Sequence, residues 1–341
     1  MPQTSAFGPG RVNLIGEHTD YNQGLCLPFA IRQGVTVTIG DGDDGVVAAR
    51  AEDLGEEDEF PVSDARPAPG WRAFVRGTVG ELLRAGHRVR GGPLSISGDV
   101  PRGAGLSSSA ALEVALALAL LAHAGEPEPD RRELARLCSR VENEWAGART
   151  GLLDQLAALL PEGGHAVLLD MRDLAASPVP LDLGDWRLVA VDSGVAHEHA
   201  ASGYNERRAE CERARDLLGL PSLRDADPEA AASLPPPLDR RVRHVIDENE
   251  RVRRAVNALA DGDPAGLGRL LDASHESLSD LYEVSVPAVD DLVQRLRASG
   301  AAGARMIGGG FGGSVLALLP PGADPPAGAL EVSAGTAARL L

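Results

Sequence analysis

The sequence contains no lysine: all 33 of its basic residues are arginines, set against 50 acidic residues. A Walker A loop needs a lysine on the β- and γ-phosphates, protein kinases need a strand lysine, and Schiff-base enzymes need an amine nucleophile. The composition excludes these three chemistries. The formal net charge of -17 also makes polyanions such as nucleic acid or an acidic membrane surface poor partners. Any bound nucleotide must therefore be held by local groups.

Cysteine is scarce too, and long apolar runs are missing. Cys26, Cys138 and Cys211 are widely spaced and form no CxxC pair, which predicts a reducing, cytoplasmic setting. Residues 1–10 have neither the basic start nor the apolar core of a secretory signal. The longest apolar run, residues 114–122, is far shorter than the roughly 20 residues of a membrane span. It predicts a buried helix.

The length of 341 residues, 43% of them hydrophobic, is enough for two domains. In the first half, strands are expected at 12–39, 46–49, 94–97 and 166–169, and helices from about 107 and over 131–146 and 151–160. In the second half, strands are expected at 187–192, 305–307 and 314–319, and helices over 205–218, 238–260 and 287–299. Strands followed by helices, twice, predict an α+β protein of two domains, which we place at residues 1–180 and 181–341.

Two glycines and three serines stand at the start of the expected apolar helix, in the segment Pro101-Arg-Gly-Ala-Gly-Leu-Ser-Ser-Ser-Ala110. Free N–H groups and the positive helix end favour an anion at such a place. The glycines allow the backbone to approach a phosphate, and serine hydroxyls can donate to phosphate or bind Mg²⁺. An ordinary serine N-cap on a core helix explains the same residues. Taken alone, the loop leaves both interpretations open.

The late segment Gly308-Gly-Gly-Phe-Gly-Gly313 matches the dinucleotide-binding pattern GxGxxG literally. Its context argues against that function, because residues 314–319 are typical of a strand and too few residues follow for a complete βαβ unit. A tight turn between two strands is the simplest interpretation. Five glycines in six residues exceed what a hairpin needs, so they also favour close approach of the backbone to a ligand or a neighbouring loop.

A polar cluster lies near the N-terminus, between Gly10 and Asn22. Carboxylates such as Glu17 and Asp20 can each accept hydrogen bonds from two sugar hydroxyls. His18 could equally be a structural histidine, and the turn could be a solvated loop. No second ligand set at metal spacing supports zinc. The pair His197 and His199 is more typical of a surface loop than of a metal site.

The segment Gly10-Arg-Val-Asn-Leu-Ile-Gly-Glu-His-Thr-Asp-Tyr-Asn-Gln-Gly24 resembles the signature of the galactokinase family. Gly103–Ser109 resembles the phosphate loop of the GHMP-kinase superfamily, and Gly308–Gly313 resembles its late glycine motif. The three follow in the family's order and spacing, and the resemblance covers essentially the whole chain. It implies a two-domain α+β fold with the active site in the interdomain cleft, and transfer of the γ-phosphate of ATP to the C1 hydroxyl of D-galactose, with ATP and Mg²⁺ bound.

The resemblance also implies a role for individual residues. Asp154 matches the catalytic aspartate and Arg11 its basic partner. The positions that match the sugar site are Glu17, His18, Thr19, Asp20, Gly151 and Tyr204. The positions that match the phosphate loop are Gly103, Ala104, Gly105, Leu106, Ser107, Ser108 and Ser109. Ser109 and Glu142 match the Mg²⁺ ligands. Asp154 could act as a base, whereas a pairing with Arg11 would lower its pKa and favour an orienting role.

The sequence departs from the family pattern in three places. Gly8 replaces the usual alanine, Thr150 stands where cysteine is common, and the chain starts close to its first motif. We expect the last difference to affect packing around the cleft more than chemistry. Two alternatives stay open: a related sugar kinase acting on N-acetylgalactosamine, galacturonate or arabinose, and a non-catalytic sensor of galactose and ATP. A cytoplasmic monomer that binds a small sugar and MgATP, and neither nucleic acid nor membrane, is expected.

Overall fold

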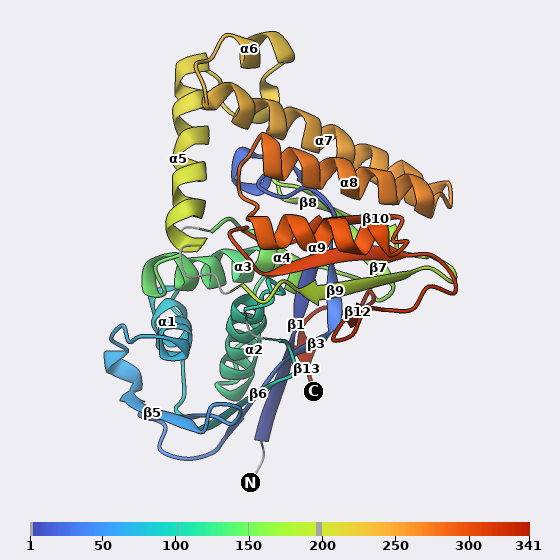
Figure 1. Ribbon diagram of the computed structural model, residues 1–341. Coiled ribbons are helices and arrows are strands. Elements are labelled where there is room, and N and C mark those ends of the chain that lie inside the picture. Colours follow the sequence, from blue (N-terminus) through green and yellow to red (C-terminus); the bar gives the residue numbers. More distant parts are fainter. Residues whose placement is uncertain (1–2, 102, 149, 196–199) are drawn as a thin grey trace.

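Alternating apolar residues near the start of the chain build a six-stranded sheet. The structure, a computed structural model, describes residues 3–101, 103–148, 150–195 and 200–341 (Figure 1). The long strands β1 (Gln3–Asn13) and β3 (Pro28–Gly40) pair antiparallel along most of their length. The strand order is β13-β1-β3-β6-β4-β5. The other strands are β4 (Val46–Ala51), β5 (Glu56–Pro61), β6 (Gly92–Gly98) and β13 (Arg339–Leu340).

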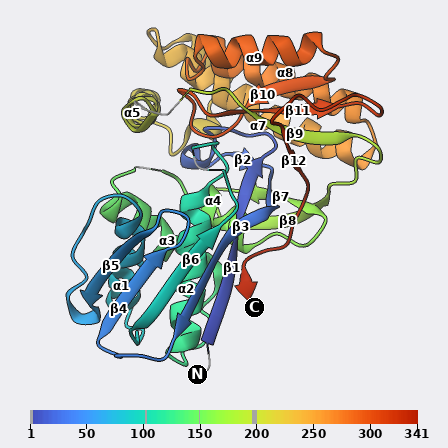
Figure 2. The same ribbon diagram turned by 60° about the horizontal axis from the view of Figure 1, so that its bottom comes forward.

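Four helices pack against this sheet and share its hydrophobic core (Figure 2). They are α1 (Trp71–Arg84), α2 (Ser108–His123), α3 (Arg131–Arg140) and α4 (Leu153–Leu159). Helix α2 is apolar on nearly all sides, as the sequence predicted, and is almost entirely buried. A Cβ atom at Gly8 would lie 2.1 Å from the carbonyl oxygen of Ala111. The absence of a side chain at Gly8 therefore lets α2 approach β1 closely.

The helix expected over residues 131–146 changes its winding partway. Helix α3 ends at Arg140, and Val141–Trp145 form a π-helical turn. The side chain of Trp145 packs where Gly77 and Gly80 of α1 lack side chains, and its Nε1 donates to Glu81 at 3.1 Å. Such wide turns are rare and often occur at functional sites. Here the turn carries Glu142, whose side chain is buried.

The second half of the chain builds a four-stranded sheet of order β10-β11-β9-β12 with helices packed on it (Figure 1). Its strands are β9 (Arg187–Asp192), β10 (Gly303–Met306), β11 (Ser314–Leu319) and β12 (Leu330–Val332). Its helices are α5 (Ala200–Leu218), α6 (Pro228–Ala232), α7 (Leu238–Ala260), α8 (Pro264–Asp280) and α9 (Pro287–Ala298). The glycine cluster joins β10 to the antiparallel β11, so the predicted turn between two strands is confirmed.

Two connections tie the halves of the molecule together. A small sheet of β2 (Leu25–Cys26), β7 (His165–Asp170) and β8 (Ala175–Pro180) lies between the larger sheets. After β12 the chain returns to the first sheet, where β13 pairs with β1 (Figure 2). The division at residue 180 stays a prediction. None of the described helices is both long enough and apolar enough to cross a membrane.

Candidate active site

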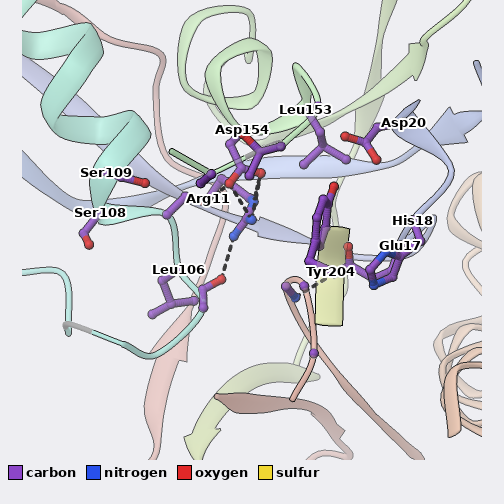
Figure 3. Close-up of a pocket in the computed structure, with 18 of the residues that line it drawn as sticks. Arg11, Glu17, His18, Asp20, Leu106, Ser108, Ser109, Leu153, Asp154 and Tyr204 are labelled. Atoms are coloured by element: carbon purple, nitrogen blue, oxygen red, sulfur yellow. Dashed lines mark hydrogen bonds and ion pairs between the residues drawn. The ribbon is translucent and has the colours of Figure 1, made fainter. Parts of the chain in front are cut away.

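The three motifs surround one cavity of about 420 Å³ (Figure 3). The loop after β1 and the loop before α2 meet there with α4, α5 and the glycine cluster. Most predicted site residues line it: Arg11, Glu17, His18, Asp20, Gly103, Gly105, Leu106, Ser107, Ser108, Ser109, Gly151, Asp154 and Tyr204. Thr19, Ala104 and Glu142 lie behind the lining.

An ion pair between Arg11 and Asp154 lies at the centre of the lining (Figure 3). Arg11 Nε and Nη2 donate to the two carboxylate oxygens of Asp154, each at 2.8 Å. The third guanidinium nitrogen, Nη1, donates to the carbonyl oxygen of Gly105 at 2.6 Å. Burial lowers the pKa of Arg11, but the charge and hydrogen bonds of Asp154, together with the charges of Glu17 and Glu142, outweigh burial, so the pKa is raised. Arg11 therefore stays charged and links the first motif, α4 and the serine loop.

The serine loop is not an ordinary helix cap. Ser107 occupies the N-cap position of α2 in a left-handed conformation, with φ of 54°, and makes no side-chain capping hydrogen bond. Its hydroxyl donates to Asp154 Oδ2 instead. Gly103 and Gly105 also have positive φ, which favours glycine. The first N–H groups of α2 consequently stay available for an anion.

Glu142 and Ser109 form a second polar group next to the loop. Ser109 Oγ donates to Glu142 Oε1 at 3.1 Å, and Thr150 Oγ1 and Gln155 Nε2 both donate to Oε2 at 2.9 Å. Burial, followed by the neighbouring Asp154, raises the pKa of Glu142. The Thr150 hydroxyl thus helps to orient this carboxylate. A cation at this place would relieve the repulsion between the two carboxylates.

Glu17 connects the first motif to the glycine cluster. Its Oε1 accepts from the backbone N–H of Gly308 at 2.9 Å and lies 3.2 Å from the buried guanidinium of Arg305. Its Oε2 accepts from Asn13 Nδ2 at 3.0 Å. Arg305 in turn donates to the carbonyl oxygens of Asn13 and Leu14. Glu17 therefore lines the cavity and also holds the neighbouring backbone of the glycine cluster in place.

His18, Asp20 and Tyr204 line the cavity at positions where the resemblance predicts the sugar site. Burial, with His244 and Arg207 nearby, lowers the pKa of His18 to about 3, so the imidazole is neutral. Burial, followed by the charge of Asp154, raises the pKa of Asp20 to about 7. A Cβ atom at position 151 would lie 1.7 Å from Asp20 Oδ2. A side chain at this position would therefore displace the Asp20 carboxylate from its place beside α4.

Two predicted residues act at a distance from the cavity. Thr19 is fully buried, and its hydroxyl oxygen lies 2.8 Å from the carbonyl oxygen of Gly16 and 2.7 Å from that of Leu25, which share its one donated proton. These bonds hold the turn that presents His18 and Asp20. Ala104 packs into the core beside the serine loop. The pair His197 and His199 lies outside the described residues.

A second cavity, of about 600 Å³, begins at the other side of Ser108 and Ser109. It lies between the sheet and α1 and is lined mainly by apolar and aromatic side chains, among them Trp71, Phe74 and Leu112. Sequence reasoning missed these residues. The aromatic pair in residues 71–74 was a visible signal in a chain so poor in aromatic residues, but nothing in the sequence placed it beside the serine loop.

Comparisons with known proteins agree with this geometry. The galactokinase galactose-binding signature matches residues 2–41, and the N-terminal and C-terminal domains of GHMP kinases match residues 73–162 and 255–335. Galactokinases of Streptomyces coelicolor and Thermotoga neapolitana are both 43% identical to the chain, covering 93% and 92% of it and 85% and 89% of their own lengths. The structure resembles that of Lactococcus lactis galactokinase complexed with galactose, with a TM-score of 0.91, 33% identity and coverage of 99% and 95% of the two chains.

Proposed function

Because the chain belongs to the galactokinase family of GHMP kinases, we propose that it transfers the γ-phosphate of ATP to the C1 hydroxyl of D-galactose in the smaller cavity. The observation that carries this proposal is the set of hydrogen bonds that Asp154 accepts from Arg11 and Ser107. It lies between the serine loop, which suits phosphate, and the wall of carboxylate and imidazole groups, which suits a sugar. A reacting hydroxyl and a phosphoryl group can therefore meet at Asp154.

Asp154 orients the attacking hydroxyl in this proposal. Both of its oxygens already accept hydrogen bonds from Arg11, and one also accepts from Ser107, so the carboxylate is held in a fixed orientation. Phosphoryl transfer passes through a loose, anionic transition state, so positioning and positive charge matter more than early proton removal. Arg11 supplies part of that charge, and the N–H groups at the start of α2 supply more.

The residues present fit Mg²⁺. Ser109 and Glu142 offer hard oxygen donors side by side, next to the helix end where phosphates would lie. Among the described residues, no three acidic, histidine or cysteine side chains are placed so that they could hold a metal ion together. Mg²⁺ often takes only one or two protein ligands and completes its shell with phosphate and water. When bound, it would neutralise charge on the β- and γ-phosphates.

The larger cavity is the proposed place for the nucleoside. It shares Ser108 and Ser109 with the sugar cavity, so a triphosphate crossing the start of α2 would reach Asp154. A flat base suits its aromatic and apolar lining. This assignment needs no lysine, in agreement with the composition.

The substrate should be galactose rather than glucose, which differs only in the orientation of the C4 hydroxyl. Inverting that hydroxyl would leave Asp20 or His18 without a partner in a buried site, a loss of roughly 1 to 3 kcal/mol, which corresponds to about 5- to 150-fold in kcat/KM. Galacturonate would bring a further carboxylate next to Glu17, Asp20 and Asp154, and we expect it to be rejected for that reason.

The test is a coupled assay of ADP formation with galactose, glucose, N-acetylgalactosamine, arabinose and galacturonate at fixed MgATP, repeated with excess chelator. We expect the highest kcat/KM with galactose, and no turnover once Mg²⁺ is removed. Preference for another sugar of the panel would identify a related sugar kinase. Binding of galactose and ATP without ADP formation would identify a sensor.

We further propose a cytoplasmic monomer that binds neither nucleic acid nor membranes, with domains divided near residue 180. The reduced cysteines and the strong negative charge support the first part of this proposal. Size-exclusion chromatography with light scattering tests the oligomeric state, because a monomer should elute at a mass near that of one chain.

A further inference from the structure

All three tyrosines of the sequence gather around His18, although they are spread from residue 21 to residue 282. The imidazole centroid lies 5.9 Å from that of Tyr21, 5.2 Å from that of Tyr204 and 4.8 Å from that of Tyr282. Tyr204 lines the sugar cavity, whereas Tyr282 is fully buried behind it. Although aromatic residues are rare in this chain, all of its tyrosines therefore lie around one histidine.

Hydrogen bonds connect this cluster into a single row. His18 Nδ1 lies 2.8 Å from Tyr21 Oη, which lies 2.8 Å from Tyr282 Oη. Tyr282 Oη then lies 3.0 Å from the sulfur of Cys211, a buried free thiol. At the other end, His18 Nε2 is buried and has no hydrogen-bond partner within the protein. His18 also lines the cavity.

The row has two possible directions, and their chemistry differs. In one, Cys211 donates to Tyr282, Tyr282 to Tyr21, and Tyr21 to Nδ1, so the imidazole proton lies on Nε2. In the other, Nδ1 donates to Tyr21 and the last acceptor is sulfur. Imidazole nitrogen is a strong acceptor and thiol sulfur a weak one, so the first direction pairs the phenol with the better acceptor. A neutral imidazole is required, which agrees with the lowered pKa of His18.

We propose that Cys211, Tyr282 and Tyr21 form a relay that holds His18 in the Nε2–H tautomer, so that Nε2 donates to an oxygen atom of the sugar. The proposal deepens the proposed function and rests on it for the identity of the acceptor. Tyr21, Tyr282 and Cys211 are positioning residues, because they act through the imidazole. With this tautomer, the sugar oxygen that contacts His18 must accept a hydrogen bond. The sugar hydroxyl that contacts Asp20 must instead donate one.

The tautomer can be measured without any activity. Two-bond ¹H–¹⁵N correlation spectra of the full chain labelled with ¹⁵N-histidine, with His18→Asn used to assign His18, distinguish the two neutral forms and the imidazolium. We expect Nε2–H in the unaltered protein. We expect the Nδ1 signal to shift strongly in Tyr21→Phe and less in Tyr282→Phe. Ser277→Ala is the matched control, since Ser277 is a buried hydroxyl bonded to the neighbouring His244 but lies outside the row.

Kinetics then test the consequence for the sugar. Tyr21→Phe should lower kcat/KM for galactose about tenfold, mainly through KM, while Ser277→Ala leaves it unchanged. Galactoses that each lack one hydroxyl then identify the hydroxyl that His18 contacts. Removing that hydroxyl should lower kcat/KM less in Tyr21→Phe than in the unaltered protein, because the variant has already lost the contact. At that position, fluorine in place of the hydroxyl should be tolerated better than hydrogen, because fluorine can accept but not donate.

Several outcomes would overturn the relay: an Nδ1–H tautomer or an imidazolium at His18, an unshifted Nδ1 signal in Tyr21→Phe, or equal losses with the fluoro and deoxy sugars. Failure of the proposed function has a different signature, because the unaltered protein would then phosphorylate no galactose while the spectra still report the tautomer. If Tyr282→Phe does not fold, the partly buried Tyr21 still provides the decisive variant.

Discussion

At the scale of single residues, Asp154 offers the sharpest test of the chemistry. Asp154→Asn keeps the shape of the side chain but removes the charge that pairs with Arg11. We expect kcat to fall by about 10² or more, with galactose binding largely intact. Steady-state kinetics and calorimetric titration with galactose measure the two quantities separately. A change confined to KM would show that Asp154 binds substrate without taking part in transfer.

Asp20 predicts a dependence on pH. Its pKa is raised to about 7, and the ionised form is the better acceptor for sugar hydroxyls. We therefore expect kcat/KM for galactose to fall about tenfold per pH unit below about 7, and Asp20→Asn to remove this slope. Because the folded-state pKa lies above the unfolded value, ionisation of Asp20 costs stability as pH rises from about 4 to 7. Asp20→Asn should accordingly have the higher Tm at pH 8 but not at pH 4. An unchanged slope in the variant would assign the pH dependence to another group.

The sequence predicted which residues lie at this site better than it predicted their hydrogen-bond partners. Linear motifs revealed Arg11, the serine loop and Asp154, because the chemistry of each is contained in a short segment. The bonds from Thr150 and Gln155 to Glu142 depend on a π-helical turn that no local pattern signalled. Likewise, the sequence left open whether a serine caps the helix or the loop binds an anion, and only the folded structure shows that the Ser107 hydroxyl donates to Asp154.

At the scale of elements, the contact between β1 and α2 leaves very little space for an added side chain. Gly8→Ala would drive a Cβ atom into the backbone of α2 at Ala111. We expect the free energy of unfolding to fall by about 1 to 3 kcal/mol, and the Mg²⁺ requirement to rise because α2 begins next to Ser109. Chemical denaturation and Mg²⁺ titration measure these effects.

Gly40→Ala is the matched control, since Gly40 also lies in the first sheet but a Cβ atom there would meet its nearest neighbours at 3.7 Å. That variant should be as stable as the unaltered protein. Equal stability of the two variants would mean that α2 adjusts freely, and that the family's usual alanine would be accommodated at this position.

The elements predicted well are those with strong patterns of their own. Residues 238–260 form α7 as expected, and the strands around the glycine cluster are confirmed. Helices α1 and α8 were missed because two glycines in each weaken the helical signal. Gly77 and Gly80 are instead explained by tertiary contact, since Trp145 fills the space beside them. Packing of this kind is invisible until the partner helix is known.

At the scale of the whole molecule, the segment after β12 fastens the two larger sheets together. The backbone N–H groups of Gly335 and Ala338 donate to Ala30 at 2.7 Å and Ala158 at 2.8 Å, and Arg131 donates to the carbonyl oxygen of Ala338. We expect a variant ending at Ala334 to lose about 2 to 4 kcal/mol of unfolding free energy, at about 1 kcal/mol per bond.

Differential scanning calorimetry measures this loss, and Leu341→Ala is the control because the Leu341 side chain is exposed and the backbone bonds remain. An unchanged Tm in the shortened variant would show that the sheets hold together without this segment. The sequence alone could not predict the tie, because strand β13 is two residues long and pairs with β1 from the far end of the chain.

The gathering of every tyrosine around His18 also gives the protein a built-in optical reporter. The three tryptophans lie elsewhere: Trp71 at the larger cavity, Trp145 in the π-helical turn and Trp186 against the core between the sheets. A sugar entering the smaller cavity should therefore perturb the tyrosine bands of the near-ultraviolet spectrum, and a nucleotide the fluorescence of Trp71. The order in which the two substrates bind can then be followed in the unaltered protein, without a dye or a label.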